Sequence, residues 1–258
     1  MHNLKSNKNT FKVNKPPLIS IITVVFNNAS HIQKTLDSIY KQHYTNYELI
    51  VIDGGSTDGT LEIIKKNKNH INFWISEKDK GIYDAFNKGI KYAKGDYVGF
   101  VNSDDILLPE AIKILTKYII LYPEKDFFFG AVKKHWGVLH GYKPWKIFFS
   151  WGFYSSHSTG FFIKLKSAKK IGKYNLKYKY SADYDYFFRM IVKKKLKGMA
   201  TKKGELFGIF RRGGFSSTIS FKDHFKEEIR IRKDNGQSFF TLAIIIIYKS
   251  LKNIKRLI

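Results

Sequence analysis

Two hydrophobic patterns alternate along the first half of the chain. Continuous apolar runs, typical of strands buried on both faces, are separated by stretches whose apolar residues recur with helical spacing. The predicted strands are 18–26, 47–53, 71–77 and 96–102. The predicted helices run from Ser30 to about Lys41, from Asp58 or Thr60 to 67, over 82–93 and onward from Pro109. Strand alternating with helix predicts an α/β fold with a mostly parallel sheet and right-handed crossovers.

Acidic residues follow the ends of three of these strands. Asp53 closes the second strand, Glu77 and Asp79 follow the third, and Asp104 and Asp105 follow the fourth. Open parallel sheets bind ligands at the carboxyl ends of their strands. Carboxylates gathered there repel one another unless a cation lies beside them. A divalent cation that arrives with a diphosphate supplies that charge through hard oxygen ligands, so the pattern predicts a metal and diphosphate site.

The second half of the chain is less regular. Residues 126–132 and 206–210 are predicted strands, and 135–162 is rich in aromatic residues interspersed with Gly, Ser and His. Most of these rings are expected in the core, whereas any that border a polar cleft would suit stacking on a sugar.

A helix is predicted over 181–190. Ser181 is its expected cap and Asp183 lies in its first turn. Asp185 and Arg189 are spaced to pair along its surface.

The chain is strongly basic. The chain has 46 Lys and Arg against 21 Asp and Glu, a formal net charge of +25. Nucleic acid, an anionic membrane and phosphorylated small molecules would each be attracted to it, although many of the lysines are equally well explained as solvated surface. Acids at the strand ends would repel a nucleic-acid backbone and no nucleic-acid motif is present. The absence of cysteine excludes disulfides and thiolate metal sites, which suits the cytoplasm.

Both ends of the chain are basic. Residues 1–17 form a polar, basic lead-in without the apolar region of a secretory signal. Residues 239–248 are strongly apolar but too few to cross a bilayer, and basic residues alternate with apolar ones after them. This tail, 236–258, suits a helix lying in the interface of an anionic membrane. The alternative is a terminal helix docked on the body of the protein.

Several motifs in this order resemble family 2 glycosyltransferases with the GT-A fold, of the bacterial kind that builds O-antigen, capsule or related surface polysaccharide. They are ISIITVVFNN (19–28), LDSIYKQHYTNYELIVIDGGSTDGT (36–60), SEKDKGIYDAFNKGIKYAKGDYVGFVNSDD (76–105), HSTGFF (157–162) and SADYDYFFRM (181–190). The resemblance implies a Rossmann-like glycosyltransferase domain over 18–235, with a nucleotide-binding half, 18–105, and an acceptor-binding half, 106–235.

The resemblance also implies roles for individual residues. Asp53 binds the nucleotide base with Asn27 nearby, unless it only stabilises its turn. The full set expected to bind the nucleotide sugar is Asn27, Asp53, Lys80, Asp84, Asn102, Asp104, Arg211 and Arg212. Asp104, Asp105 and His157 are the expected ligands of Mg²⁺ or Mn²⁺. Asn102 stands where the family more often has an Asp, which leaves one charge fewer for the ion. Asp105 could instead contact the ribose or a water molecule, or cap the helix that contains Pro109.

The implied reaction is transfer with inversion from a nucleotide sugar, usually a UDP-sugar, to a hydroxyl of a saccharide acceptor. Asp183 is the expected general base; the alternative is a helix acid favoured by the macrodipole. Together with the tail, the resemblance implies a polyprenyl-diphosphate-linked acceptor at the cytoplasmic face of the inner membrane. A catalytically silent nucleotide-sugar-binding or scaffolding protein of the same fold is the alternative, since Ala182 and Asn102 depart from the family pattern.

Overall fold

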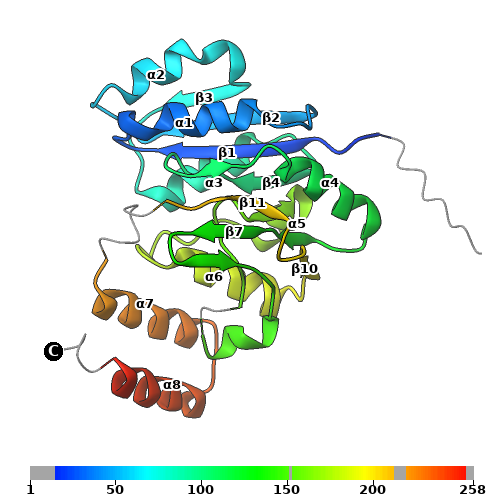
Figure 1. The fold of residues 1–258 in the computed structure, drawn as a ribbon. Coiled ribbons are helices and arrows are strands. Elements are labelled where there is room, and N and C mark those ends of the chain that lie inside the picture. The colour runs from blue at the N-terminus through cyan, green and yellow to red at the C-terminus, as the bar shows by residue number, and fades with distance from the viewer. Residues whose placement is uncertain (1–14, 151–152, 212–218, 254–258) are drawn as a thin grey trace, which may run out of the picture.

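The computed structural model describes residues 15–150, 153–211 and 219–253. At its centre is a seven-stranded sheet in the order β10-β6-β9-β4-β1-β2-β3 (Figure 1). These strands are β1 (Ile19–Val25), β2 (Tyr47–Asp53), β3 (Phe73–Ser76), β4 (Tyr97–Phe100), β6 (Phe127–Phe129), β9 (Phe161–Lys164) and β10 (Gly198–Ala200). β1 to β4 pair in parallel, as predicted. β9 was not predicted as a strand and runs antiparallel between β4 and β6.

Helices cover both faces of the sheet because successive strand residues point to opposite sides. Ile21 and Val51 face the cluster that contains the helices of one side, and Ile22 and Ile52 face the other cluster. On the first side lie α1 (Ala29–Tyr40), α2 (Thr60–Lys66) and α4 (Ala111–Leu121). On the second lie α3 (Ile82–Tyr92), α5 (Leu165–Ile171) and α6 (Ala182–Phe188). The expected α/β fold, a mostly parallel sheet flanked by helices, is confirmed.

A smaller four-stranded sheet lies beside the main one. It comprises β5 (Ile106–Leu107), β11 (Leu206–Ile209), β7 (Ala131–Lys134) and β8 (Gly137–Leu139) in that order. Short helical turns are η1 (Lys68–His70), η2 (Pro144–Phe148) and η3 (Arg189–Lys193). Because β6 and β9 come from the second half of the chain and enter the main sheet beside β4, the two predicted halves share one core.

The start of α1 differs from the prediction, whereas α2 begins at Thr60, one of the two predicted residues. Asn28, not Ser30, precedes the first residue of α1, and Ser30 lies inside the helix. The Asp58 carboxylate accepts the Ala29 N–H at 3.0 Å and the Thr60 N–H at 3.1 Å. The Asp58 side chain therefore satisfies an N–H at the start of each helix. From the sequence, α1 was expected to start at Ser30.

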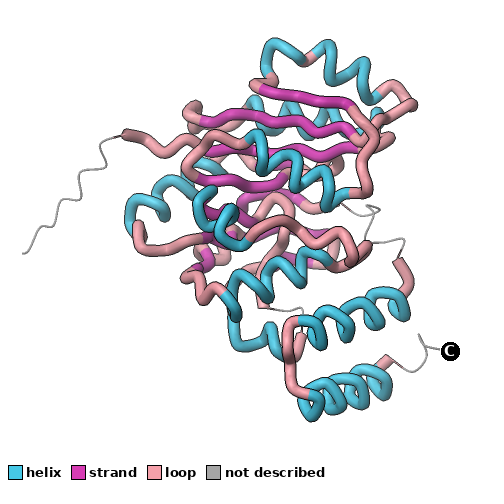
Figure 2. The backbone as a smooth tube through the Cα atoms, turned by 180° about the vertical axis from the view of Figure 1, so that it is seen from behind, coloured by secondary structure: helices cyan, strands magenta, loops and turns pink. Residues whose placement is uncertain are grey.

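The tail forms a helix that is docked on the body by one side. α7 (Phe221–Asp234) and α8 (Phe239–Lys252) lie side by side at the lower edge of Figure 1 and again in the reverse view of Figure 2. Leu242 and Ile245 of α8 are buried, and Lys249 Nζ contacts the Glu228 carboxylate of α7 at 2.6 Å. The described part of the chain contains no helix with the length and apolarity of a membrane span.

The close approach of β9 to β4 gives a test of the fold. A Cβ at Gly99 would lie 2.3 Å from the Phe162 ring and 2.9 Å from the Phe161 carbonyl oxygen. Gly99→Ala should therefore lower the free energy of unfolding by about 1–3 kcal/mol through overpacking, measured by urea denaturation. Gly204→Ala is the control, because its Cβ meets open space, and should change stability by less than about 0.5 kcal/mol. Equal midpoints for the two variants would contradict the β4–β9 pairing.

Candidate functional site

The carboxyl ends of β1, β2, β3 and β4 lie along one edge of the main sheet. At the end of β1, Asn27 adopts a positive φ of 47°, a region that Asn tolerates better than most residues. Its N–H donates to Ser56 Oγ at 2.8 Å and its Oδ1 accepts the Thr57 N–H at 2.8 Å. Asn27 therefore joins the end of β1 to the turn that follows β2.

Asp53 is enclosed by that same turn. Its carboxylate accepts hydrogen bonds from Ser56 Oγ and Ser76 Oγ, both at 2.5 Å, and from the Ser56 N–H at 3.1 Å. The residue has no exposed surface. The arrangement matches the alternative in which Asp53 stabilises its turn. Direct contact with a base would require these hydrogen bonds to rearrange, so base binding by Asp53 stays a prediction.

The loop after β3 holds Asp79, Lys80 and Asp84 together through the backbone. Asp79 Oδ1 accepts the Gly81 N–H at 2.8 Å, and Asp84 Oδ2 accepts the Lys80 N–H at 3.1 Å. Burial raises the pKa of Asp79. The Lys80 side chain is exposed at this edge and available to an anion.

The turn after β4 presents the oxygen atoms expected for a metal ion. Asn102 Oδ1 is buried and has no hydrogen-bond partner within the described residues. Burial raises the pKa of Asp104, although the nearby His31 and Arg211 charges oppose the shift. An orphaned amide oxygen and a partly desolvated carboxylate are hard ligands of the kind Mg²⁺ and Mn²⁺ take. Asn102 and Asp104 therefore fit a cation that receives its other ligands from a diphosphate.

Asp105 points away from that site, contrary to the expected metal role. It is fully buried, and its Oδ2 accepts from Ser158 Oγ at 2.7 Å and Thr159 Oγ1 at 2.9 Å. Burial, and then the Asp104 charge, raise the pKa of Asp105 to about 7. It does not cap α4 either, which begins after Glu110. The repulsion between the adjacent acids is thus relieved by separation, hydroxyl donors and proton uptake.

His157 is part of an aromatic cluster. Its Nε2 hydrogen-bonds the Tyr174 hydroxyl at 2.7 Å, and its ring stacks on Phe100 at 5.1 Å between centroids. Burial lowers the pKa of His157 to about 3, so the ring is neutral. Among the described residues no group of three or more His, Cys, Asp or Glu is arranged to hold a metal. The expected set of Asp104, Asp105 and His157 is therefore not assembled.

Asp183 has the environment expected of a general base. It lies in the first turn of α6, after Ser181, whose side chain makes no capping hydrogen bond. The Tyr83 hydroxyl of α3 donates to Asp183 Oδ1 at 3.1 Å, and the Tyr184 N–H donates to the same oxygen at 2.9 Å. Burial raises the pKa of Asp183 to about 6. The carboxylate is oriented, partly desolvated and ionised near neutral pH.

Of the two arginines expected to bind the diphosphate, Arg211 lies beside the turn that follows β4 and carries Asp104 and Asp105. Its N–H donates to Asp105 Oδ1 at 3.4 Å, and its charge lowers the pKa of Asp104. Arg212 lies outside the described residues.

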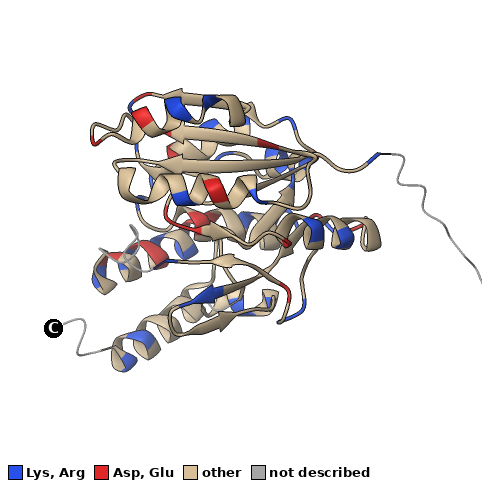
Figure 3. Cartoon of the chain, turned by 45° about the horizontal axis from the view of Figure 1, so that its top comes forward, with Lys and Arg blue, Asp and Glu red and all other residues tan. Residues whose placement is uncertain are grey.

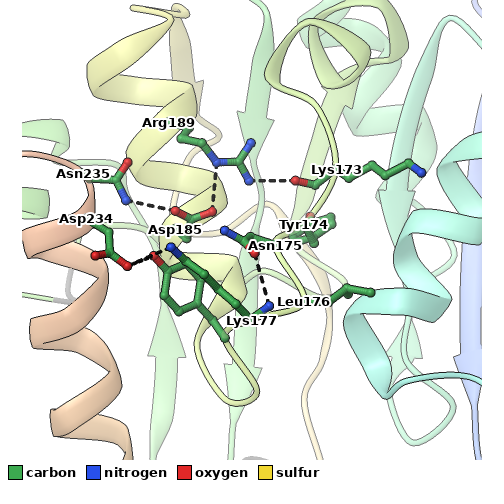
Figure 4. A pocket seen from close by; sticks show the side chains of 10 residues that line it. Lys173, Tyr174, Asn175, Leu176, Lys177, Asp185, Arg189, Asp234 and Asn235 are labelled. Atoms are coloured by element: carbon green, nitrogen blue, oxygen red, sulfur yellow. Dashed lines mark hydrogen bonds and ion pairs between the residues drawn. The ribbon is translucent and has the colours of Figure 1, made fainter.

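A pocket of about 550 Å³ opens between α6, α7 and residues 173–178 (Figure 4). Four of its charged side chains form two ion pairs: Arg189 binds Asp185 at 2.9 Å, a pairing that the sequence predicted, and Lys177 binds Asp234 at 2.9 Å. Asn235 Nδ2 also donates to Asp185 Oδ1 at 2.9 Å. Asp185 thus holds α6 to the end of α7, whereas Asp183 of the same helix accepts a hydrogen bond from Tyr83.

Residues 20–197 match the family described as glycosyl transferase family 2. The chain belongs to this family. It is 37% identical over 108 residues to hyaluronan synthase of Pasteurella multocida, a match covering 41% of this chain and only 11% of that protein. It is 29% identical over 224 residues to a PGL/p-HBAD biosynthesis glycosyltransferase of Mycobacterium bovis, with 81% of this chain and 83% of the relative covered.

Solved structures extend the comparison to the whole fold of this family 2 member. TarS of S. aureus in complex with UDP-GlcNAc has a TM-score of 0.67 at 18% identity, covering 88% of this chain and 71% of that chain. A mannosyltransferase of Pyrobaculum calidifontis in complex with GDP-Man and Mn²⁺ has a TM-score of 0.64 at 16% identity, covering 92% and 70%. The expected GT-A fold is confirmed.

Sequence reasoning missed three aromatic residues of this family 2 site. Phe26, which directly follows β1, is 62% exposed beside Gly54 at the strand-end edge. Its position after a fully buried strand was the available signal. Tyr83 donates to Asp183, and the Asp183 charge, together with burial, raises the pKa of Tyr154. No local pattern links these two tyrosines to an acid so far along the chain.

The buried Asp105 predicts a pH-dependent stability. Its folded pKa of about 7 lies above the ordinary value of 3.8, so the folded state holds the extra proton and loses stability as pH rises from 4 to 7. The free energy of unfolding of Asp105→Asn, relative to that of the wild type, should therefore rise by on the order of 2–4 kcal/mol between pH 5 and pH 8, measured by urea unfolding. Asp58→Asn is the control, because the pKa of Asp58 is lowered and its titration ends below pH 5. If the free energy of unfolding changes with pH in the same way for the wild type and for Asp105→Asn, the raised pKa of Asp105 is contradicted.

Proposed function

We propose that this protein is an inverting glycosyltransferase that moves a sugar from a nucleotide-sugar donor, a UDP-sugar, to a hydroxyl of a saccharide acceptor. The observation that carries the proposal is the oriented Asp183 carboxylate with its pKa of about 6. Membership of family 2 and the likeness to TarS in its UDP-GlcNAc complex support the donor class.

Asp183 accepts the proton of the acceptor hydroxyl in a single displacement. The acceptor oxygen attacks the anomeric carbon opposite the diphosphate, a bond forms there, and the bond to the diphosphate oxygen breaks. A positioned carboxylate contributes about 10²–10⁴-fold to such a step. Tyr83 orients Asp183 by donating to one oxygen. Ionised above pH 6, the carboxylate is ready to receive the proton at neutral pH.

The donor lies along the edge formed by the strand ends. The exposed ring of Phe26 stacks on the base, beside Asn27 and Asp53. Asn102 and Asp104 would hold Mg²⁺ or Mn²⁺, which would supply positive charge beside the departing nucleoside diphosphate. Lys80 and Arg211 add donors to the phosphate oxygens, as guanidinium and ammonium groups do elsewhere.

The acceptor is a lipid-linked saccharide, polyprenyl-diphosphate-linked, in the synthesis of a surface polysaccharide such as O-antigen or capsule. This proposal draws on the names of the relatives, among them hyaluronan synthase and the PGL/p-HBAD biosynthesis glycosyltransferase. It also draws on the basic, apolar tail. The enzyme works in the cytoplasm at the inner face of the membrane.

Replacing the proposed base tests the reaction directly. Asp183→Asn should retain UDP binding in a thermal-shift assay with Mn²⁺ and lower turnover of the UDP-sugar by about 10²-fold or more. Wild-type turnover should fall below about pH 6 as Asp183 takes up a proton. The folded state should gain stability in the variant, because it no longer buries a charge.

Asp185→Asn is the matched control one turn along α6. It should lower thermal stability by breaking the contacts with Arg189 and Asn235 while sparing turnover per folded molecule. Near-normal turnover in Asp183→Asn would show that another residue is the general base. Loss of turnover in Asp185→Asn alone would make Asp185 the base and Asp183 the structural acid.

The proposed metal ligands predict opposite effects at neighbouring positions. Asn102→Asp should lower the Mn²⁺ concentration needed for UDP to stabilise the protein by about tenfold, equivalent to about 1.4 kcal/mol, because a carboxylate replaces the orphaned amide oxygen. Asp104→Asn should raise it. The measurement is the UDP-induced thermal shift as a function of Mn²⁺. An unchanged Mn²⁺ dependence in both variants would contradict a metal site at this turn.

A further inference from the structure

α8 is docked by one side and carries large apolar side chains on the other. Leu242 and Ile245 are buried, whereas Phe239 is 86% exposed, Phe240 76% and Leu251 68%. Single exposed apolar residues are common on protein surfaces, but several on one helix indicate an interaction surface.

The turn η2 adds aromatic side chains beside the start of α8. Arg232 Nη1 and Gln237 Nε2 both donate to the Phe148 carbonyl oxygen, at 2.6 and 2.8 Å. Gln237 immediately precedes the N-cap of α8, so the end of η2 is fixed against the beginning of that helix. Trp145 is 61% exposed and Phe149 52%. The η2–α8 face is defined by Trp145, Phe149, Phe239, Phe240, Ile247 and Leu251.

The two segments that form the η2–α8 face carry only basic charges, and Glu228 of the neighbouring α7 is paired with Lys249. Residues 127–182, which include η2, and residues 235–258, which include α8, contain no Asp or Glu. The helix beside the C-terminal label in Figure 3 accordingly shows blue and tan but no red. Lys146 Nζ lies 5.6 Å from the Trp145 ring centroid, and Lys252 Nζ lies 5.7 Å from that of Tyr248. Aromatic rings with adjacent lysines suit the boundary between lipid and headgroup.

A buried cluster of charged residues attaches α8 to α7. Glu228 of α7 binds Lys249 of α8 at 2.6 Å and Arg232 at 2.8 Å, and the Arg232 side chain is fully buried. Because loss of either partner would leave a buried charge unpaired, α7, α8 and η2 are held in one arrangement. Lys249 is therefore engaged in this cluster and does not contribute a free charge to the face.

The residue next to Glu228 connects α7 to the segment that carries the proposed base. The Glu227 carboxylate accepts the Lys179 N–H at 2.6 Å and the Tyr180 N–H at 2.7 Å, just before α6 and Asp183. His224, also on α7, hydrogen-bonds Ser181 Oγ at 3.2 Å. One helix therefore contacts both α8 and the loop before Asp183.

The geometry points to the η2–α8 face as the surface that docks on an anionic lipid membrane, with α7 fixing the Asp183 loop relative to that membrane. An anionic lipid surface neutralises the lysines around the face, whereas a second copy of this chain would bring like charges together. The role for Asp183 rests on the proposed function, but membrane docking does not.

Co-sedimentation of the full chain with vesicles tests the docking. Wild-type protein should bind vesicles of phosphatidylcholine with phosphatidylglycerol, and binding should weaken with added salt and be much weaker to phosphatidylcholine alone. Leu251→Glu should reduce binding by about tenfold or more, since it removes apolar contact and adds a repelled charge. Leu121→Glu is the matched control: Leu121 is 57% exposed at the end of α4, which covers the opposite face of the main sheet from η2. This variant should bind as the wild type does.

Thermal unfolding of the same samples shows whether each variant is folded, and the shift that UDP adds tests the proposed function separately. Equal binding of the two variants to anionic vesicles would overturn the proposal, as would absence of wild-type binding. A wild-type dimer in light scattering that Leu251→Glu dissociates would also overturn it in favour of a contact between copies. Vesicle binding without UDP stabilisation would instead leave the docking face in place and contradict the nucleotide site.

Discussion

The Asp105 carboxylate joins segments that are far apart in the sequence at the carboxyl ends of the strands. It follows β4 and accepts hydrogen bonds from Ser158 and Thr159, which precede β9. Ser158 Oγ in turn accepts the Asn102 N–H at 3.0 Å. The turn that presents Asn102 and Asp104 is therefore fixed by residues that sit against the aromatic core, and it is the pairing of β9 with β4 that brings them there.

The electrostatics of the site follow from how each acid is buried. Asp53 and Asp105 are fully buried with several donors each, and they shape the backbone. Asp104 and Asp183 are only partly buried, and the pKa of each is raised by desolvation. Carboxylates that remain accessible while losing part of their hydration are suited to binding a cation or a proton. The four acids thus fall into two that are enclosed by hydrogen-bond donors and two that keep some exposed surface.

Much of the fold was predictable because β1, β2 and β4 are buried on both faces and give continuous apolar runs. β9 was missed because its Phe161 and Phe162 lie in a segment where rings are frequent for other reasons. Asp104 and Asp105 cannot be told apart locally; Ser158 and Thr159 decide which one turns inward, and only the folded sheet brings them near. The contact of Tyr83 with Asp183 likewise joins the first turns of two helices on the same face of the sheet. The sequence placed acids at the strand ends and in α6, but it did not reveal the residues that orient them.

The central claim is that Asp183 receives the acceptor proton while the sugar passes to the acceptor in one displacement. The anomeric configuration of the product tests this most directly, because a single displacement inverts the configuration of the donor. After reaction of an α-linked UDP-sugar, the anomeric proton coupling in the NMR spectrum of the product should be that of a β-linkage. Retention of the α-configuration would require a different mechanism and would contradict the role assigned to Asp183.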